Sequence, residues 1–358
     1  MNESKTVRRW QGVLLGVVIL ALTASLPWLT NPGLLFLAGL TLIQAVFALS
    51  WNLLFGYAGL ASFGHAGFFA VGAYFTGACL RYHLGIPFML VLLLADVFGA
   101  AVAWLIGIVA LRRLAGIFLA VLTVALSEVL RLIVGYTRFL GREDGLNNIP
   151  RPTIDMGLFV IDLTSSTAYF LFLIVACSLL TGALWWLVHS RYGRVFQTIR
   201  QDAERAAFTG TNVAAYRLLA FMISGGVAAM AGGLFAPWTR IVTTDEVNWL
   251  MSIQPILNTL LGGVGSFWGP VVGAVGFTII NYSTRTYVGL SEVVVGGILV
   301  AVILLAPNGI MGLISGLRAR AARRRPAAEP APAAQSTHPP GGQPAPLPVG
   351  QHLPGSQP

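Results

Sequence analysis

The side chains that could carry out chemistry are few in this sequence, and their spacing indicates neither catalysis nor metal binding. Cys79 and Cys177 each lie inside an apolar run, so no disulfide framework or cysteine-based metal site is indicated. Lysine occurs once, as Lys5, and no Gly-Lys-Ser or Gly-Lys-Thr is present. A phosphate-binding loop needs such a lysine. We therefore expect no catalytic residue, no metal and no ATPase site, so that any ATP driving this chain is bound by a partner subunit.

Charged side chains inside the apolar runs are equally rare. Glu128 and Arg131 have helical spacing and are expected to pair with each other. Arg285 and Glu292 lie near the ends of runs, where their side chains reach water. Because no paired carboxylates accompany it, His65 is interpreted as a structural histidine, and an intramembrane enzyme is disfavoured.

The richest combination of glycine and polar residues inside an apolar run covers residues 52–74. Glycine weakens a helix and lets backbones approach each other. Non-helical backbone at membrane depth survives only where protein or a water-filled cavity surrounds it. The pattern indicates either a broken helix beside a translocation pathway or close helix packing, and its polar residues favour the pathway because buried polar groups need partners. The candidate pathway residues here are Asn52, Gly56, Gly59, Ser62, Gly64 and His65.

A second segment, at residues 258–270, repeats this pattern. Its asparagine and first glycines have the spacing found in the first segment, and in both segments a Ser-Phe pair follows. Paired interrupted helices in two halves of a chain indicate the binding region of a transporter. This segment adds the candidates Asn258, Gly262, Gly265 and Ser266. The expected number of spans makes the two repeats parallel, and an error of one span would make them inverted.

Residues 190–213 form a polar, arginine-rich segment between two apolar runs. Asp202 is placed to cap a short helix and Gly210 to end it. Three alanines (203, 206 and 207) share one helix face with Gly210, and we expect this smooth face to dock into a groove of another protein. A loop whose arginines only set the membrane topology is the alternative.

The elements that hold these residues are expected to be membrane-spanning helices. Charged residues make up 10% of the chain and hydrophobic residues 56%, whereas a soluble domain has about 25% charged residues. This excludes a soluble enzyme, a disordered protein or a coiled coil as a description of the whole chain. A bilayer core of roughly 30 Å needs about 20 apolar residues of helix, which gives about ten spans, with eight or nine as alternatives. The expected spans are 11–29, 34–55, 58–80, 88–110, 114–135, 167–188, 214–236, 250–264, 267–285 and 289–306.

The net charge of +9 is distributed as in a membrane protein. Its cations gather beside apolar runs, at 5–9, 112–113, 191–217 and 318–325, which places these segments and both termini in the cytoplasm. The acidic residues gather in 136–166 and 237–249, which are expected outside. A nucleic-acid-binding protein would gather its cations on a polar face, so no nucleic-acid partner is expected.

The chain is accordingly divided into three parts. Residues 1–10 are the cytoplasmic N-terminus, and residues 11–315 are the transmembrane domain that contains the 190–213 segment. Residues 316–358 begin as a basic stretch and become rich in Pro, Ala and Gly. Because they contain few hydrophobic residues, they are expected to form a disordered cytoplasmic tail.

Several of these stretches together resemble a known family. The sequence is similar to the LivM-type membrane permeases of branched-chain amino acid ABC importers. The resemblance covers roughly residues 45–315, and its most specific parts are 52–74 and 191–236. It is supported by the stretches 114–120, 144–150, 261–270 and 306–310.

The resemblance implies an all-α polytopic fold similar to the vitamin B12 importer (type II) permeases, with about ten helices, in the bacterial inner membrane. It implies as partners a second related permease, two ATPase subunits that bind ATP, and a periplasmic substrate-binding protein. The stretch Glu204-x-Ala206-Ala207-x-x-Gly210 is similar to the family's ATPase-docking motif, although Arg205 interrupts it. Transport by alternating access would follow. The ATPase-coupling candidates are Arg200, Asp202, Glu204, Ala206, Ala207 and Gly210.

Two other functions stay open at this point. Permeases for urea and short amides are similar to these permeases, and the sequence does not separate the two cargoes. An ion-coupled secondary transporter would need no ATPase and should have charged residues along its pathway.

Overall fold

The computed structural model describes residues 20–113, 117–155 and 160–284, together with 293, 296–297, 300, 304 and 309–313. All of these belong to the unit Met1–Gly316. Outside the described residues lie the expected N-terminal segment 1–10, the start of the first expected span, Arg285 at the end of the ninth span, most of the last span with Glu292, and the 316–358 tail.

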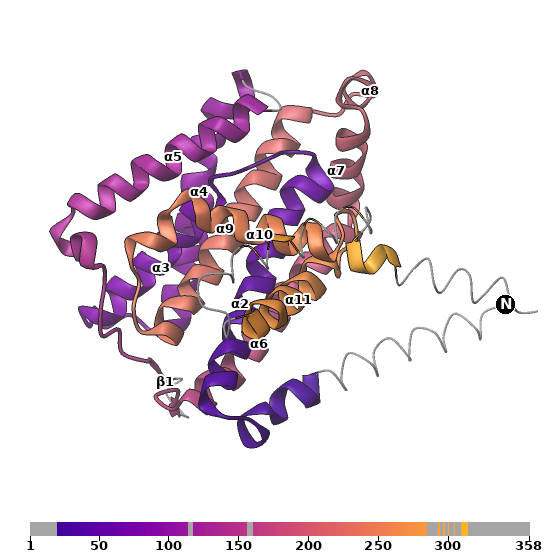
Figure 1. Ribbon diagram of the computed structural model, residues 1–358. Coiled ribbons are helices and arrows are strands. Elements are labelled where there is room, and N and C mark those ends of the chain that lie inside the picture. Colours follow the sequence, from indigo (N-terminus) through magenta and orange to yellow (C-terminus); the bar gives the residue numbers. More distant parts are fainter. Residues whose placement is uncertain are drawn as a thin grey trace, which may run out of the picture. The chain divides into compact units, whose positions relative to one another are not determined.

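Helices form most of the described chain, and their bounds follow the apolar runs (Figure 1). A short apolar helix covers Leu20–Leu29. The longer helices are α2 (Pro32–Asn52), α3 (His65–Arg81), α4 (Phe88–Arg113), α5 (Ile117–Tyr136), α6 (Ser166–His189), α9 (Val213–Thr239), α10 (Trp249–Gly262) and α11 (Gly269–Thr284). Two polar helices, α7 (Arg191–Gln201) and α8 (Ala203–Phe208), lie between α6 and α9, and short turns complete the set: η1 (Leu53–Ala58), η2 (Arg138–Leu140), η3 (Arg142–Asp144) and η4 (Thr244–Val247).

Five helices of the described chain are long and apolar enough to cross a membrane. They are α2 with η1, α4, α5, α6 and α9. Helices α3, α10 and α11 have 17, 14 and 16 residues, fewer than the roughly 20 that a bilayer core requires. The expected span 58–80 is therefore wrong at its start, because α3 begins only at His65.

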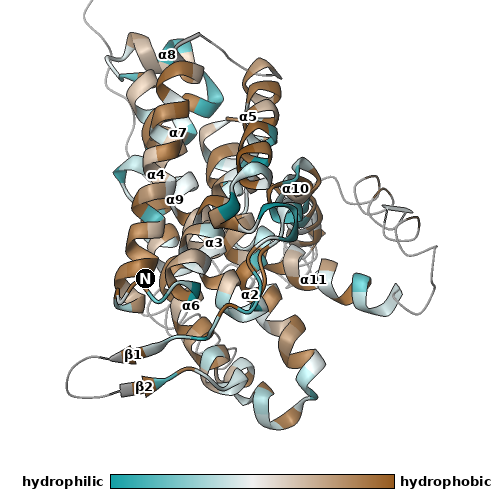
Figure 2. Cartoon of the chain, turned by 90° about the vertical axis from the view of Figure 1, so that its left-hand side faces the viewer, coloured by the Kyte–Doolittle hydropathy of each residue, from teal (hydrophilic) through white to brown (hydrophobic). Residues whose placement is uncertain are grey.

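Helix α9 is the most enclosed of the five. In its most apolar stretch 72% of the residues are buried, compared with 28% in α4, α5 and α6. Its sequence explains this position, since small residues fill its centre and let other helices approach. The apolar side chains of α4 and α5 instead remain exposed over much of their length, as expected for surfaces that face lipid. Figure 2 shows hydrophobic residues along most of the length of the helices.

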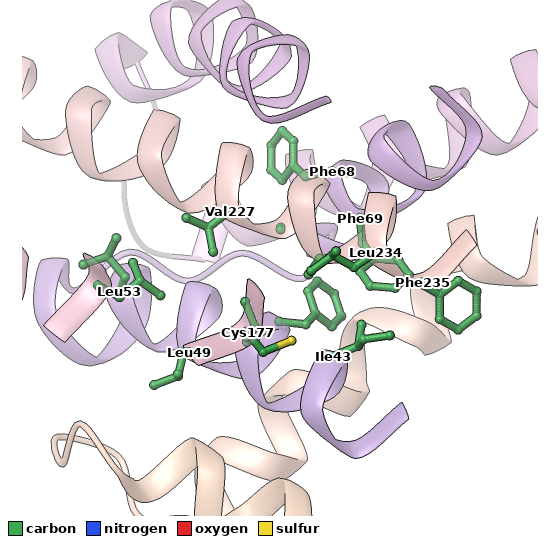
Figure 3. Packing of buried hydrophobic residues seen from close by; sticks show 14 of the residues in the cluster. Ile43, Leu49, Leu53, Phe68, Phe69, Cys177, Val227, Leu234 and Phe235 are labelled. Atoms are coloured by element: carbon green, nitrogen blue, oxygen red, sulfur yellow. The ribbon is translucent and has the colours of Figure 1, made fainter. Parts of the chain in front are cut away.

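Glycine brings α3 and α9 into backbone contact. A Cβ added at Gly72 of α3 would overlap the carbonyl oxygen of Ala229 in α9, and one added at Gly232 of α9 would overlap the carbonyl oxygen of Phe69 in α3. Around this contact, large apolar side chains of α2, α3, α6 and α9 form the main core (Figure 3). The labelled members of this core are Ile43, Leu49, Leu53, Phe68, Phe69, Cys177, Val227, Leu234 and Phe235.

The described chain is mostly helical, as expected, and contains one short pair of strands in a polar connection. Strands β1 (Thr153–Asp155) and β2 (Val160–Asp162) form an antiparallel pair before α6. An isolated bridge also joins Leu146 to Val242, with N–H···O distances of 2.8 and 2.9 Å. The strands arise because this polar connection has no helical apolar periodicity, so its backbone groups pair across a hairpin instead.

The expected pair of charged residues on α5 is present. Arg131 Nε lies 2.7 Å from Glu128 Oε2, one helical turn away. This pair satisfies both charges locally, which supports its structural interpretation.

Candidate functional site

The expected break in the first glycine-rich segment lies between η1 and α3. Helix α2 widens into the π-helical turn η1, which ends at Ala58 and is followed by Gly59. The φ angle of Gly59 is 71°, in the left-handed region that favours glycine. The chain is then non-helical up to Gly64, and α3 starts at His65.

Hydroxyl groups from two other helices hold this non-helical segment. Phe63 and Gly64 donate their N–H groups to Thr123 Oγ1 of α5 at 3.1 and 3.3 Å. Ala66, in the first turn of α3, donates its N–H to Ser252 Oγ of α10 at 2.9 Å. These donors would otherwise be unsatisfied at a helix start. The sequence analysis did not identify Thr123 or Ser252, whose only signal was a hydroxyl group within an apolar run.

His65 is part of a buried polar contact, in agreement with its interpretation as a structural histidine. Its side chain is fully buried, its ring stacks on Phe47, and its Nε2 lies 2.9 Å from Ser50 Oγ. Since Ser50 donates its own hydroxyl hydrogen to the carbonyl oxygen of Phe47, its oxygen accepts from the histidine Nε2–H group. This assignment leaves Nδ1 as the acceptor nitrogen.

The second glycine-rich segment also contains a helix break, and the two breaks are in contact. Helix α10 ends at Gly262 and α11 begins at Gly269, with Gly265 at a φ of 94° between them. Asn52, at the end of α2, donates from Nδ2 to the carbonyl oxygen of Ser266 at 3.2 Å. The two segments therefore share helix-break-helix geometry and also a hydrogen bond.

Close packing occurs at the second break as well. A Cβ at Gly262 would overlap the carbonyl oxygen of Gly269, and a Cβ at Gly273 would overlap that of Asn258. The sequence analysis gave two interpretations of the glycine-rich segments, a broken helix or close helix packing. In this second segment both are present. Around the two breaks, four buried side-chain atoms have no hydrogen-bond partner within the described residues: Asn52 Oδ1, Ser62 Oγ, His65 Nδ1 and Asn258 Oδ1.

The 190–213 segment folds as two capped helices, α7 and α8. Ser190 caps α7 by accepting the N–H of Tyr192 at 3.2 Å. Asp202 caps α8 by accepting the N–H of Arg205 at 3.0 Å, and the two side chains form an ion pair at 2.9 Å. Gly210, with a φ of 84°, follows the end of α8. The predicted roles of Asp202 and Gly210 as start and stop are both present.

The expected smooth face of small residues is wrong in one respect. Ala206 is buried against its own chain, with 1% of its surface exposed, so it is not available to another protein. Glu204, Ala207 and Gly210 are exposed. The largest exposed apolar group of α8 is Phe208, whose side chain is 91% exposed. Phe208 was not among the predicted site residues, although it is a large apolar residue in an otherwise polar and small-residue stretch.

Arg200, near the end of α7, joins this helix pair to the first break. Its guanidinium donates to the carbonyl oxygen of Gly56 in η1. A Cβ placed on Gly59 would lie 3.1 Å from Cγ of Arg200. The absence of a side chain at Gly59 therefore lets α7 lie directly against η1.

Helix α8 and the strand pair lie at opposite ends of the helices. In both Figure 1 and Figure 2, α7 and α8 are at the top and β1 is at the bottom. This is the separation that the distribution of arginines and acidic residues predicts for the 190–213 and 136–166 segments.

Two titratable groups outside the apolar spans, Glu246 of η4 and Asp162 of β2, have shifted pKa values. Burial raises the pKa of Glu246, although its carboxylate accepts the N–H and hydroxyl groups of Thr243 at 2.8 Å. Hydrogen bonds from the hydroxyl and N–H groups of Thr164 lower the pKa of Asp162.

A polar hollow of about 390 Å³ is lined by Arg81, His83, Asn147, Asn148, Pro150 and Arg240.

The known proteins that this chain resembles are permease proteins of transport systems. The chain is 28% identical to the high-affinity branched-chain amino acid transport system permease protein LivM of Escherichia coli, over 82% of this chain and 74% of that protein. It is 23% identical to LivH of Escherichia coli, over 75% of this chain and 91% of the relative. The galactose/methyl galactoside import permease MglC of Salmonella typhimurium is 25% identical over 61% of this chain and 67% of its own length. No solved structure matches this chain at a significant level.

One family description fits both the helical architecture and these relatives. The family model described as branched-chain amino acid transport system / permease component matches residues 33–306. This range contains both helix breaks and the α7–α8 pair. The chain therefore belongs to the family of branched-chain amino acid transport system permease components.

Proposed function

We propose that this chain is the permease subunit of an ATP-driven importer in the bacterial inner membrane. Its cargo is a branched-chain or related hydrophobic amino acid, which it moves by alternating access. Family membership supports the transport class, and the names of the relatives LivM and LivH indicate branched-chain amino acids. The fold we expect for the complete chain is the ten-helix arrangement of vitamin B12 importer permeases, with both termini in the cytoplasm.

The exposed ring of Phe208 is the observation that carries the coupling part of this proposal. Helix α8 is short, capped by Asp202, and ends in a phenylalanine that is 91% exposed. A large aromatic group on a polar helix outside the apolar spans gains most from burial in a partner's groove. Glu204, Ala207 and Gly210 lie exposed beside it, so that a groove can approach the backbone closely. We assign this surface to docking of the ATPase.

The two contacting helix breaks support a pathway between α2, α3, α10 and α11. Broken helices inside a membrane protein are tolerated where other protein surrounds them, and here side chains of α5, α7 and α10 satisfy the freed backbone groups. Buried polar atoms without partners, such as Asn52 Oδ1 and Asn258 Oδ1, are costly in an apolar core. Their presence at the breaks favours a polar route that opens and closes as the helices move.

The proposed assembly contains four kinds of subunit. Similarity to both LivM and LivH supports pairing with a second, related permease. Two ATPase subunits would bind ATP, since the sequence has no phosphate-binding loop of its own. A periplasmic binding protein would deliver the amino acid and supply most of the selectivity.

Uptake measurements with two radiolabelled compounds test the cargo. Cells that lack other importers and carry this chain with its neighbouring transport genes should accumulate leucine. Urea represents the alternative class of urea and short-amide permeases. Urea uptake that leucine does not inhibit, with no leucine uptake, would overturn the amino-acid assignment.

Gentle detergent extraction tests the dependence on ATPases. An ATPase subunit should co-purify with the wild-type chain, and Ala207→Trp should prevent this while the variant still inserts into the membrane, because the indole would fill the docking surface. If the purified chain transported leucine without an ATPase subunit, driven by an ion gradient, the secondary-transporter alternative would be supported instead.

A further inference from the structure

Arg200 closes a contact between two elements that are far apart in the sequence. Its guanidinium reaches the carbonyl oxygen of Gly56, 144 positions away along the chain. That carbonyl belongs to η1, the last turn before the first break. Carbonyl groups at the end of a helix lack acceptor roles within the helix and need outside donors. Arg200 therefore caps a membrane helix from α7.

The backbone at Gly59 is built to allow this contact. Its left-handed φ of 71° turns the chain away from η1, and a Cβ there would lie 3.1, 3.4 and 3.5 Å from Cγ, Cβ and Cα of Arg200. These distances show that the main chain of α7, and not only the tip of a long side chain, lies against the break. A movement of α7 must then either carry η1 along or break the hydrogen bond.

The same break is held on its other side by hydroxyl groups of two other helices. Thr123 of α5 and Ser252 of α10 hold the N–H groups that precede and begin α3. The carbonyl side of the break thus depends on α7, and the N–H side depends on the membrane helices. Such a segment has one end that the docking helices can move and one end that stays anchored.

We propose that Arg200 is a positioning residue that latches the α7–α8 pair to the first helix break and releases it during each transport cycle. This inference rests on the proposed coupling function. With the latch closed, as in this structure, the Gly56 carbonyl is capped and the break keeps its present shape. When the ATPases pull on α8, the hydrogen bond opens, and η1 is free to repack against the second break through Asn52 and Ser266.

The first experiment measures the amino acids transported per ATP hydrolysed by the complete importer in proteoliposomes. Arg200→Ala should hydrolyse ATP at the wild-type rate or faster, while transport per ATP falls about tenfold, within the usual range of coupling between sites. Arg200→Lys should recover much of the loss, because one ammonium group can still donate to one carbonyl. Arg194→Ala, an exposed arginine on the same helix, is the matched control and should behave as wild type.

An unchanged transport-to-ATP ratio in assembled Arg200→Ala importer would overturn the latch. Failure of the ATPase to assemble with the wild-type chain would instead refute the proposed function itself, so the two failures are distinguishable. A loss of ratio that Arg194→Ala shares would also contradict the inference, because it would reflect charge alone.

A disulfide trap tests the same contact with a covalent bond in place of the hydrogen bond. The Cβ distance of 3.4 Å between the two positions is close to the roughly 3.5–4.5 Å of a disulfide, so Gly59→Cys with Arg200→Cys should cross-link on oxidation in a background of Cys79→Ala and Cys177→Ala. The reduced double variant lacks the guanidinium and should show the low transport per ATP of Arg200→Ala. In the oxidised form the cross-link holds α7 against the break, and transport should stop. Failure to cross-link, or equal transport in both redox states, would contradict an opening latch.

Discussion

Phe208 is the most exposed large hydrophobic side chain among the described residues. Its ring is 91% exposed although it lies on a helix outside the apolar spans. Removing such an anchor from an interface costs about 2 kcal/mol or more, which is roughly a 30-fold loss of affinity.

We expect Phe208→Ala to weaken ATPase binding by roughly that 30-fold factor while membrane insertion is unchanged. Titration of the purified ATPase against the permease in detergent would measure this change. Phe139→Ala is the matched control, because that phenylalanine is also exposed, at 53%, but belongs to the connection before the strand pair. Equal affinity in all three proteins would remove the docking assignment.

A second prediction at this scale concerns the half-buried Glu246. Burial raises its pKa above the usual 4.5, so the carboxyl group keeps its proton to a higher pH in the folded protein than in the unfolded chain. Its stabilising contribution is complete below pH 4.5 and is lost as the pH rises through the raised pKa. Glu246→Gln stays neutral and retains an oxygen that can accept from Thr243. The variant should therefore unfold at a higher temperature than wild type at pH 8, with the difference disappearing at about pH 4.

The control for this measurement is Asp144→Asn, because Asp144 is an exposed carboxylate that is not among the groups raising the pKa of Glu246. Its replacement should leave the pH dependence unchanged. The measurement is the thermal unfolding temperature of wild type and both variants in detergent at the two pH values. A less stable Glu246→Gln protein at pH 8 would show that the hydrogen bonds from Thr243 outweigh the cost of burial.

Residue types alone could predict some of these details. Asp202 and Gly210 were identified from capping chemistry, because a cap depends on a few adjacent residues. The partners of the first break, Thr123, Ser252 and Arg200, lie in other helices, and local patterns carry no information about which helices meet there. Ala206 was misplaced for the same reason: its burial depends on what lies beneath α8.

At the scale of elements, the packing of α3 against α9 depends on two glycines that face each other's backbones. Gly72 and Gly232 leave no room for a Cβ. Adding a large side chain to a close-packed interface costs about 1–3 kcal/mol. We expect Gly72→Leu to lower the unfolding temperature in detergent and to reduce the yield of folded protein.

Gly182 of α6 provides the comparison, since nothing lies within 4 Å of a Cβ added there. Gly182→Leu should be tolerated because the added side chain meets open space. Size-exclusion profiles and thermal unfolding of both variants would test this. Similar destabilisation by both would indicate that the intrinsic cost of the substitution, and not the α3–α9 contact, is being measured.

Long apolar runs predicted the bounds of α4, α5, α6 and α9 to within a few residues, because each must satisfy its own backbone in lipid. The short strands β1 and β2 were not predicted, since their pairing arises within a polar connection without periodicity. The start of α3 was predicted too early for a physical reason: apolar composition continues through residues 58–64, while the backbone there departs from the helix.

At the scale of the whole molecule, the positions of α8 and the strand pair at opposite ends (Figure 1) allow a direct test of topology. In intact cells, Thr164→Cys should react with a membrane-impermeant maleimide, and Thr209→Cys should react only after the membrane is opened. The native cysteines are buried, so the background should be low. Labelling of both sites from outside would place the docking surface on the wrong side for an ATPase.

The exposed ring at the end of α8 has a consequence for cells that make the subunits in unequal amounts. A copy without its motor would display an aromatic group of the kind that surveillance proteases and chaperones recognise. We expect such orphan copies to be degraded faster than those in finished complexes, so that one phenylalanine also reports whether assembly is complete.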